Sequence, residues 1–190
     1  MIKKLADRWA AYMIANGADA GQEEVYVYGF QCLANELVSD VILIALMLPL
    51  GKAKEMLIWI LVFDVLRQKV GRYHAATPLK CQLQSISVGI LSVLAQPVWE
   101  RNGGLGTVSM LLACVIVFKI APVTNPRHPV SDLQKKQAQK SARIFTAVSA
   151  LLSVLLFAIV PALSAMIQVS VCSVVLLGLI GKRQNSIHED

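Results

Sequence analysis

The stretch RIFTAVSALLSVLLFAIVPALSAMIQVSVCSVVLLGLIG, residues 143–181, decides the fold class of this chain. It contains one charged residue, Arg143, and one proline, Pro161. Because proline ends one helix or begins the next, the stretch predicts two helices, over about 143–160 and 162–181. Both are long and apolar enough to cross the hydrocarbon core of a bilayer.

Four more apolar runs precede this stretch, over about 27–50, 54–70, 83–99 and 104–121. Asp64 and Arg67 interrupt the second run, so we expect it to be tilted, partly exposed to water or re-entrant. The 190 residues are 56% hydrophobic and 16% charged, and the mean hydropathy is +0.60. A soluble domain of this length needs more polar surface. The sequence therefore predicts an all-α, polytopic integral membrane helical bundle with about six transmembrane helices.

Residues 2–15 precede the first span and predict an amphipathic helix, because Ile2, Leu5, Trp9 and Met13 share one side of it. Two interpretations remain open for this helix. It either lies in the membrane interface or simply leads into the first span.

Basic residues lie in the short gaps between apolar runs, although the net charge of the chain is +6. They do not gather on one face or in one tail, which argues against nucleic acid as a partner. Fourteen of the 18 Lys and Arg residues fall in one set of gaps, which holds both termini and residues 67–82. The positive-inside rule places this set in the cytoplasm. We therefore expect a multi-pass protein of the cell membrane, a single membrane domain over residues 1–190. It divides into an amphipathic segment (1–22) and a bundle (23–183) with a cytoplasmic loop at 67–82.

The polar break GRYHAATPLKC, residues 71–81, contains a histidine and a cysteine within that cytoplasmic loop. Thr77 and Pro78 predict the start of a helix, because Thr caps helices well and Pro fits the first helical position. Cys81 then falls in or just past the first turn. The positive end of the helix dipole and the basic neighbours of Cys81 favour its reactive thiolate form.

His74 precedes Cys81 by seven residues. On one continuous helix the two side chains would be roughly 10 Å apart along the axis, which is too far for a base to reach a nucleophile at about 3 Å. Because Pro78 breaks the helical run, the chain can fold back and bring the imidazole toward the sulfur. Such a pair is the minimal machinery of a thiol protease. The alternative is a solvated histidine that lies near a cysteine by chance. No third or fourth metal ligand is apparent, so we expect no metal and no cofactor.

The segment RQKVGRYHAATPLKCQLQS, residues 67–85, is similar to the core motif of the accessory gene regulator B (AgrB) family. The matching residues are Arg67, Gly71, Tyr73, His74, Ala75, Thr77, Cys81 and Ser85. A second segment, APVTNPRHPVS at 121–131, resembles a loop that precedes a basic stretch in the same family. The likeness extends over nearly the whole chain in length, span order and the two basic loops. One departure is Arg72, which stands where the family usually carries a second glycine.

The resemblance implies a bacterial membrane cysteine endopeptidase that acts in quorum sensing. Such an enzyme cuts the C-terminal part from an AgrD-type precursor peptide and closes the remainder into a thiolactone or lactone. Cys81 would be the nucleophile, and His74 would deprotonate it and later protonate the leaving amine. The active site would face the cytoplasm. The implied partners are the AgrD-like precursor, the lipid bilayer and a second copy of the chain in a homodimer.

Five further residues are candidates for binding the precursor: Arg67, Arg72, Ser85, Lys135 and Lys136. Arg72 would serve an acidic precursor tail, or would mark a different substrate. Lys135 and Lys136 would recognise the same tail or attract anionic lipid. Ser85 lies one turn beyond Cys81, and its alternative role is a hydrogen bond within the bundle.

Carboxylates inside the apolar runs support rival hypotheses. Glu36 and Asp40 are four residues apart, so they share one face of the first span. They either pair with Arg67 or line a precursor groove, or they lie in a hydrated region near the interface. Together with Asp64 they support a small transporter or exporter with an ion path. A third hypothesis is a non-enzymatic membrane scaffold whose basic loops dock a partner. We expect His128, the rival histidine, to be solvated.

Overall fold

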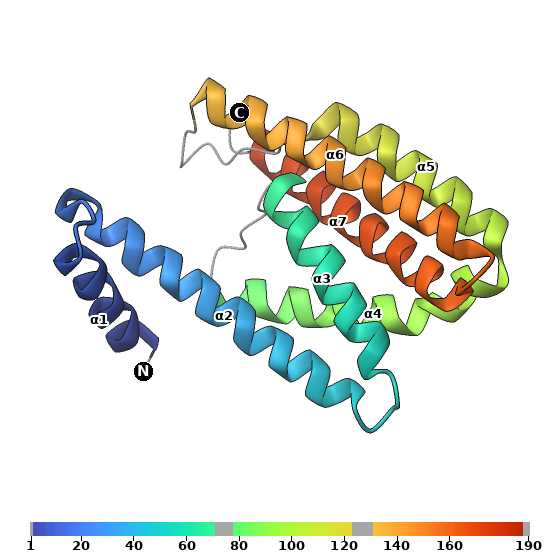
Figure 1. Ribbon diagram of the computed structural model, residues 1–190, viewed down its shortest axis with the longest axis horizontal. Coiled ribbons are helices and arrows are strands. Elements are labelled where there is room, and N and C mark those ends of the chain that lie inside the picture. Colours follow the sequence, from blue (N-terminus) through green and yellow to red (C-terminus); the bar gives the residue numbers. More distant parts are fainter. Residues whose placement is uncertain (1, 71–77, 123–130, 188–190) are drawn as a thin grey trace.

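The computed structural model describes residues 2–70, 78–122 and 131–187, and helices make up nearly all of them (Figure 1). The α-helices are α1 (Ile2–Ala15), α2 (Glu23–Met47), α3 (Ala53–Val70), α4 (Pro78–Arg101), α5 (Gly103–Ile120), α6 (Asp132–Phe157) and α7 (Pro161–Ile187). A short 3-10 helix, η1 (Ala20–Gln22), joins α1 to α2. No strand occurs in these residues, which confirms the predicted all-α class.

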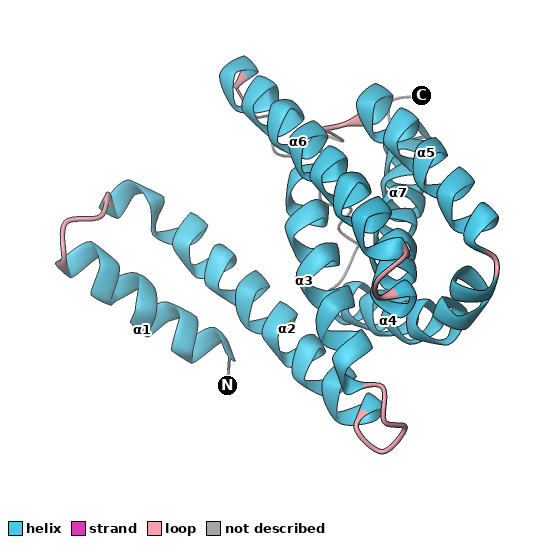
Figure 2. Cartoon of the chain, turned by 45° about the vertical axis from the view of Figure 1, so that its right-hand side comes forward, coloured by secondary structure: helices cyan, strands magenta, loops and turns pink. Residues whose placement is uncertain are grey.

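Helix α7 is the centre of the bundle. It packs against α3, α4, α5 and α6, and Figures 1 and 2 both show these helices gathered around it. Between Ser164 and Val175 every side chain except that of Cys172 is buried. The core of the protein therefore surrounds one helix, which is also the most apolar of the candidate spans.

Helix α3 contributes the largest side chains to this core. Its buried residues recur at spacings of three and four, which is one face of an α-helix, and they are Met56, Trp59, Ile60, Phe63, Leu66 and Val70. The rings of Trp59 and Phe63 stack with their centroids 4.1 Å apart. The benzene part of Trp59 lies against Gly89 of α4, where a Cβ would come within 3.1 Å of the ring. The absence of a side chain at Gly89 therefore lets α3 and α4 approach closely.

The outer faces of α5 and α6 expose apolar side chains. They include Leu111, Leu112, Val115 and Phe118 on α5, and Val148, Leu151, Val154 and Leu155 on α6. Water would solvate so large an apolar surface poorly, whereas lipid tails match it. These faces confirm the predicted membrane bundle.

The six long helices α2 to α7 occupy the six predicted segments, but the predicted count of six spans is not confirmed. Within the part of the chain that the structure describes, four helical segments are long and apolar enough to cross a membrane: Ala20–Met47, Gly103–Ile120, Asp132–Phe157 and Pro161–Arg183. Helix α3 is not apolar enough to be counted among these segments, because charged residues interrupt it, as its sequence suggested. Ser and Gln residues recur along α4 and lower its hydropathy.

Helix α1 packs on α2 and lies to one side of the other helices (Figure 2). Ala6 and Ala10 are fully buried in this contact, and the rings of Trp9 and Phe30 are 5.2 Å apart. After α1 the chain turns through Gly17, whose φ of +98° favours glycine. The predicted helix over residues 2–15 is thus confirmed, while its location in the membrane interface stays a prediction.

Candidate functional site

Cys81 lies in the first turn of α4, because the helix begins at Pro78. This confirms that Pro78 takes the first helical position, as the Thr-Pro pair predicts. The first backbone N–H groups of a helix have no acceptor within it, so the backbone of Cys81 stands at the positive end of the α4 dipole. The side chain of Cys81 lies outside the described residues, as do His74 and Arg72. The predicted contact between the imidazole and the sulfur therefore stays a prediction.

Arg67 and Ser85 are two predicted site residues that the structure brings together. Nη1 of Arg67, near the end of α3, donates a hydrogen bond of 2.7 Å to Oγ of Ser85 on α4. The guanidinium carbon of Arg67 also lies 5.5 Å from the centroid of the Phe63 ring, within the range of a cation–π contact. Phe63 is fully buried, so the guanidinium group rests on a rigid support.

This contact fixes the beginning of α4 relative to α3. Ser85 follows Cys81 by four residues, which is about one helical turn. The bundle-internal role that we considered for Ser85 is therefore observed, and the predicted precursor contact of Arg67 and Ser85 stays a prediction. This hydrogen bond therefore holds the end of α4 that carries Cys81.

Three carboxylates lie near the same contact. Asp64 of α3 interacts electrostatically with Asp40 and Glu36 of α2, and with Arg67 three residues further along α3. All three carboxylates are on half-buried residues. Arg67 is therefore the basic group that attracts Asp64 within this acidic region, while the predicted pairing of Glu36 and Asp40 with Arg67 stays a prediction.

Lys135 and Lys136 lie apart from these residues, in the first turns of α6. Both are exposed. A capping box begins this helix: Oγ of Ser131 accepts from the backbone N–H of Gln134, and Oε1 of Gln134 accepts from the backbone N–H of Ser131. The two lysines are thus presented on an ordered helix end, open to a precursor or to lipid.

Arg143 has a structural role that sequence reasoning missed. Its Nη2 donates 3.0 Å to the backbone oxygen of Phe118, and its guanidinium carbon lies 5.4 Å from the centroid of the Phe118 ring. Because the last carbonyl groups of a helix lack partners within it, Arg143 caps the end of α5 from α6. The sequence signal was a lone cation at the start of an apolar run.

A buried polar cluster between α6 and α7 was also missed. Nε2 of Gln168 donates 2.9 Å to Oγ of Ser153, and Oγ of Ser164 donates 2.8 Å to the backbone oxygen of Ser153. The oxygen of the Gln168 side chain lies against Gly106 of α5. Polar residues four apart within an apolar span, here Ser164 and Gln168, are the pattern that predicts such an interhelical contact.

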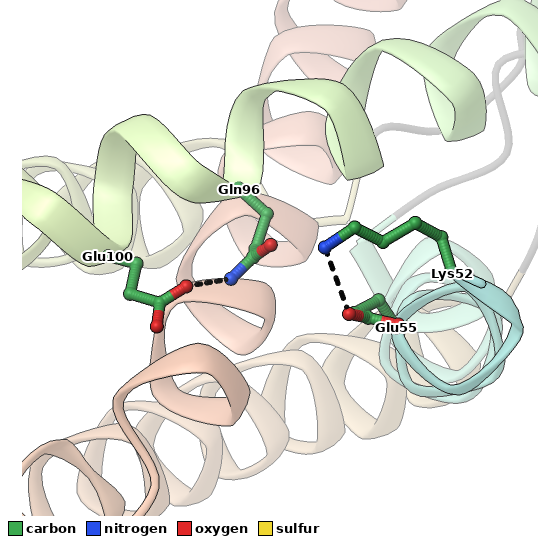
Figure 3. Close-up of polar contacts among 4 residues, drawn as sticks. All are labelled: Lys52, Glu55, Gln96 and Glu100. Atoms are coloured by element: carbon green, nitrogen blue, oxygen red, sulfur yellow. Dashed lines mark hydrogen bonds and ion pairs between the residues drawn. The ribbon is translucent and has the colours of Figure 1, made fainter. Parts of the chain in front are cut away.

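Gln96 belongs to a further polar region, at the end of α4. Its Nε2 donates 2.6 Å to Oε2 of Glu100. Lys52, just before α3, donates 3.1 Å to Oε1 of Glu55. Figure 3 shows both pairs in one view, with Gln96 and Glu100 on α4 and with Lys52 and Glu55 at the start of α3. Gln96 is only 1% exposed, and its Oε1 has no hydrogen-bond partner among the described residues.

Comparisons with known proteins agree with the motif. The model of one family, described as accessory gene regulator B, matches residues 6–181. No curated protein and no solved structure shows a significant match to the chain.

Proposed function

The chain belongs to the accessory gene regulator B family, and we propose that it is a membrane cysteine endopeptidase that cleaves and cyclises an AgrD-type precursor peptide. The position of Cys81 in the first turn of α4 carries this proposal. A thiol at the positive end of a helix dipole ionises more readily. The backbone N–H groups of that turn are suited to stabilise a developing oxyanion.

The first step is cleavage of the precursor. His74 takes the proton of the Cys81 thiol, and the thiolate attacks the carbonyl carbon of the scissile peptide bond. The C–N bond breaks as the C–S bond of a thioester forms, and His74 returns the proton to the leaving amine. The C-terminal part of the precursor departs, and its N-terminal part stays bound to Cys81.

The second step is ring closure. A Cys or Ser side chain within the bound precursor loses its proton to His74 and attacks the thioester carbonyl. The bond to Cys81 breaks, the sulfur regains the proton from His74, and a thiolactone or lactone is released. Exchange between thioesters needs no ATP because the acyl group is already activated. A site at a membrane surface limits the access of water, which would otherwise hydrolyse the thioester.

Arg67 supports this chemistry by its bond to Ser85. The bond joins α3 to α4 one turn from Cys81, so it fixes the direction in which the start of α4 points. Lys135 and Lys136 supply exposed positive charge for an acidic precursor tail.

The decisive experiment uses the full chain in lipid with an AgrD-type precursor. We expect mass spectrometry to find a covalent adduct at Cys81, and to find the cut peptide and the ring product. Cys81→Ala and His74→Ala should abolish cleavage while the helical content is kept. Cys32→Ala, at a half-buried thiol of α2, and His128→Ala are the matched controls and should retain cleavage. Cleavage by folded Cys81→Ala protein would overturn the proposal.

The exporter is a second candidate, and the three half-buried acidic residues Glu36, Asp40 and Asp64 on α2 and α3 favour it. In that case Asp64→Asn should abolish movement of a peptide across the membrane, and Cys81→Ala should not. Loss of precursor cleavage in Cys81→Ala protein would instead identify the peptidase.

A further inference from the structure

Helix α4 carries polar side chains along one face, from its second turn to its last. They are Ser85, Ser92, Gln96 and Glu100, and we name this set the α4 polar face. Spacings of seven and four residues place them on one side of the helix. Cys81 precedes the first of them by one turn. The face therefore extends from the nucleophile to the opposite end of α4.

Other helices contact this face along its length. Arg67 of α3 donates to Ser85 at 2.7 Å. Further along, Oγ of Ser92 and Oγ of Ser173 on α7 are hydrogen-bonded at 2.8 Å. Ser92 and Ser173 are buried, as is Gln96 beyond them. The α4 polar face is thus enclosed by α3 and α7 in the middle of the bundle rather than turned to lipid.

An acceptor without a partner lies on this face. Oε1 of Gln96 is buried and unpaired among the described residues. The next residue is Pro97, which has no N–H to give to the carbonyl of Val93 in the turn before it. Buried acceptors without donors are rare and costly. This part of α4 is therefore suited to receive N–H donors from elsewhere.

The distribution of charge indicates which donors fit. Ser92 and Gln96 in the middle of the face, and Ser173 of α7 bonded to Ser92, are neutral. Charged groups of the described residues stand toward its two ends, as Arg67 at one and Glu100 with the Lys52–Glu55 pair at the other. An ion would be poorly stabilised in such a middle section. The N–H and C=O groups of a peptide match it, because a hydroxyl both donates and accepts.

We propose that the α4 polar face is the exit path of the ring product, leading from Cys81 to the end of the bundle that carries Lys52 and Glu55. This inference rests on the proposed function and extends it. The path is closed in this structure, since Ser92 and Ser173 bond to each other. On passage of a peptide, α4 and α7 separate there, and each hydroxyl exchanges its partner for an amide group of the peptide. Gln96 receives one of the peptide N–H groups.

A reversible lock tests the path without requiring cleavage. Ser92→Cys and Ser173→Cys replace the two bonded hydroxyl groups by thiols, and we expect oxidation to join these thiols by a disulfide across the contact. We would make this pair in the Cys81→Ala background, so that the proposed nucleophile is absent. The protein is placed in liposomes, and a synthetic peptide closed as a thiolactone is added outside. Its arrival in the lumen is measured by mass spectrometry.

Before oxidation, we expect this protein to carry the ring peptide inside faster than protein-free liposomes allow. Oxidation should lower transfer to the level of protein-free liposomes, and a phosphine reductant should restore it. Cys81→Ala protein with both serines intact should be unaffected by either treatment. Equal transfer by locked and unlocked protein would overturn the path. Because no arm needs cleavage, that result is distinct from failure of the peptidase.

A milder variant addresses the possibility that the cysteine pair fails to fold. Gln96→Met retains side-chain length but removes the unpaired acceptor. We expect it to slow transfer about tenfold, the loss of roughly one hydrogen bond to the peptide. The matched control is Gln168→Met, which alters a buried glutamine on the other side of α7 and should leave transfer unchanged. Wild-type transfer by Gln96→Met would also contradict the path.

Discussion

Arg67 and Ser85 are joined by a hydrogen bond of 2.7 Å between α3 and α4, one helical turn from Cys81. Arg67 also rests on the buried ring of Phe63. The contact thus connects the packed core to the residue that we propose as the nucleophile. A change in it is expected to alter where the nucleophile points more than how tightly the precursor binds.

Arg67→Lys should lower kcat for precursor cleavage by about 10–100-fold and change KM little, because a small displacement of a reacting group costs that much in rate. Lysine keeps the charge but lacks the planar fork that contacts Ser85 and Phe63 together. Cleavage kinetics in lipid measure the effect. Ser85→Ala should also lower kcat. The kcat of the double variant should be no lower than that of the more damaging single variant, because both changes break the same contact. Arg143→Lys is the control, since it disturbs a similar arginine–phenylalanine contact at the end of α5. A rise in KM with kcat unchanged would show that Arg67 binds the precursor instead.

Lys135→Gln combined with Lys136→Gln should raise KM for a precursor with an acidic tail by roughly two- to thirtyfold, corresponding to two exposed ion pairs of about 0.2–1 kcal/mol each. The difference from the wild type should shrink at high salt because exposed charges are screened. Titration of the precursor at two salt concentrations checks both statements. Lys3→Gln combined with Lys4→Gln removes the same charge elsewhere and serves as the control. An unchanged KM would assign the two α6 lysines to lipid.

Gly106→Ala should destabilise the bundle by about 1–3 kcal/mol, the usual cost of an overpacked core. A Cβ at Gly106 would overlap the side-chain oxygen of Gln168 and lie 3.0 Å from its Cδ. Thermal unfolding in detergent should show a Tm lower by roughly 2–10 °C. Gly104→Ala is the matched control, because a Cβ there meets nothing within 4 Å. Equal Tm values for the two variants would mean that α5 and α7 are not packed as closely as described.

Gln96→Met and Gln168→Met should differ in stability although they are the same substitution in the same bundle. Gln168→Met removes the amide that donates to Oγ of Ser153 within a buried cluster, so we expect a loss of about 1–3 kcal/mol. Gln96→Met removes an oxygen that has no partner among the described residues and returns the exposed Glu100 to water. Its stability should therefore stay within about 1 kcal/mol of the wild type. Denaturation of the two variants in parallel compares their free energies of unfolding. A larger loss of stability for Gln96→Met than for Gln168→Met would contradict the described hydrogen bonds.

The sequence was sufficient to predict most helices, since the apolar runs and the Thr-Pro signal before α4 are local features. It placed the starts of α2 and α6 too late, at about 27 and 143 instead of Glu23 and Asp132. Apolarity marks the part of a helix that faces lipid, while the polar first turns continue the same helix in water. For α6 the signal was present, because Ser131 and Gln134 have the spacing of a capping box.

The contacts within the site were harder to predict than the helices. Arg67 and Ser85 were both recognised from the motif, but their bond depends on how α3 crosses α4, which no local pattern specifies. The close approach of Gly106 to Gln168 likewise depends on two helices far apart in sequence. Polar residues within α4 lower its hydropathy. That they share one face which the bundle buries depends on how α3 and α7 pack against α4, and the sequence does not specify this packing.

The central position of α7 has a consequence for biogenesis. Of the described helices it is the last to leave the ribosome, yet α3, α4, α5 and α6 all pack against it. The earlier helices must therefore wait in the bilayer without their common partner until translation reaches residue 187. A nascent chain arrested before Pro161 would hold every preceding helix and still lack the element around which they assemble.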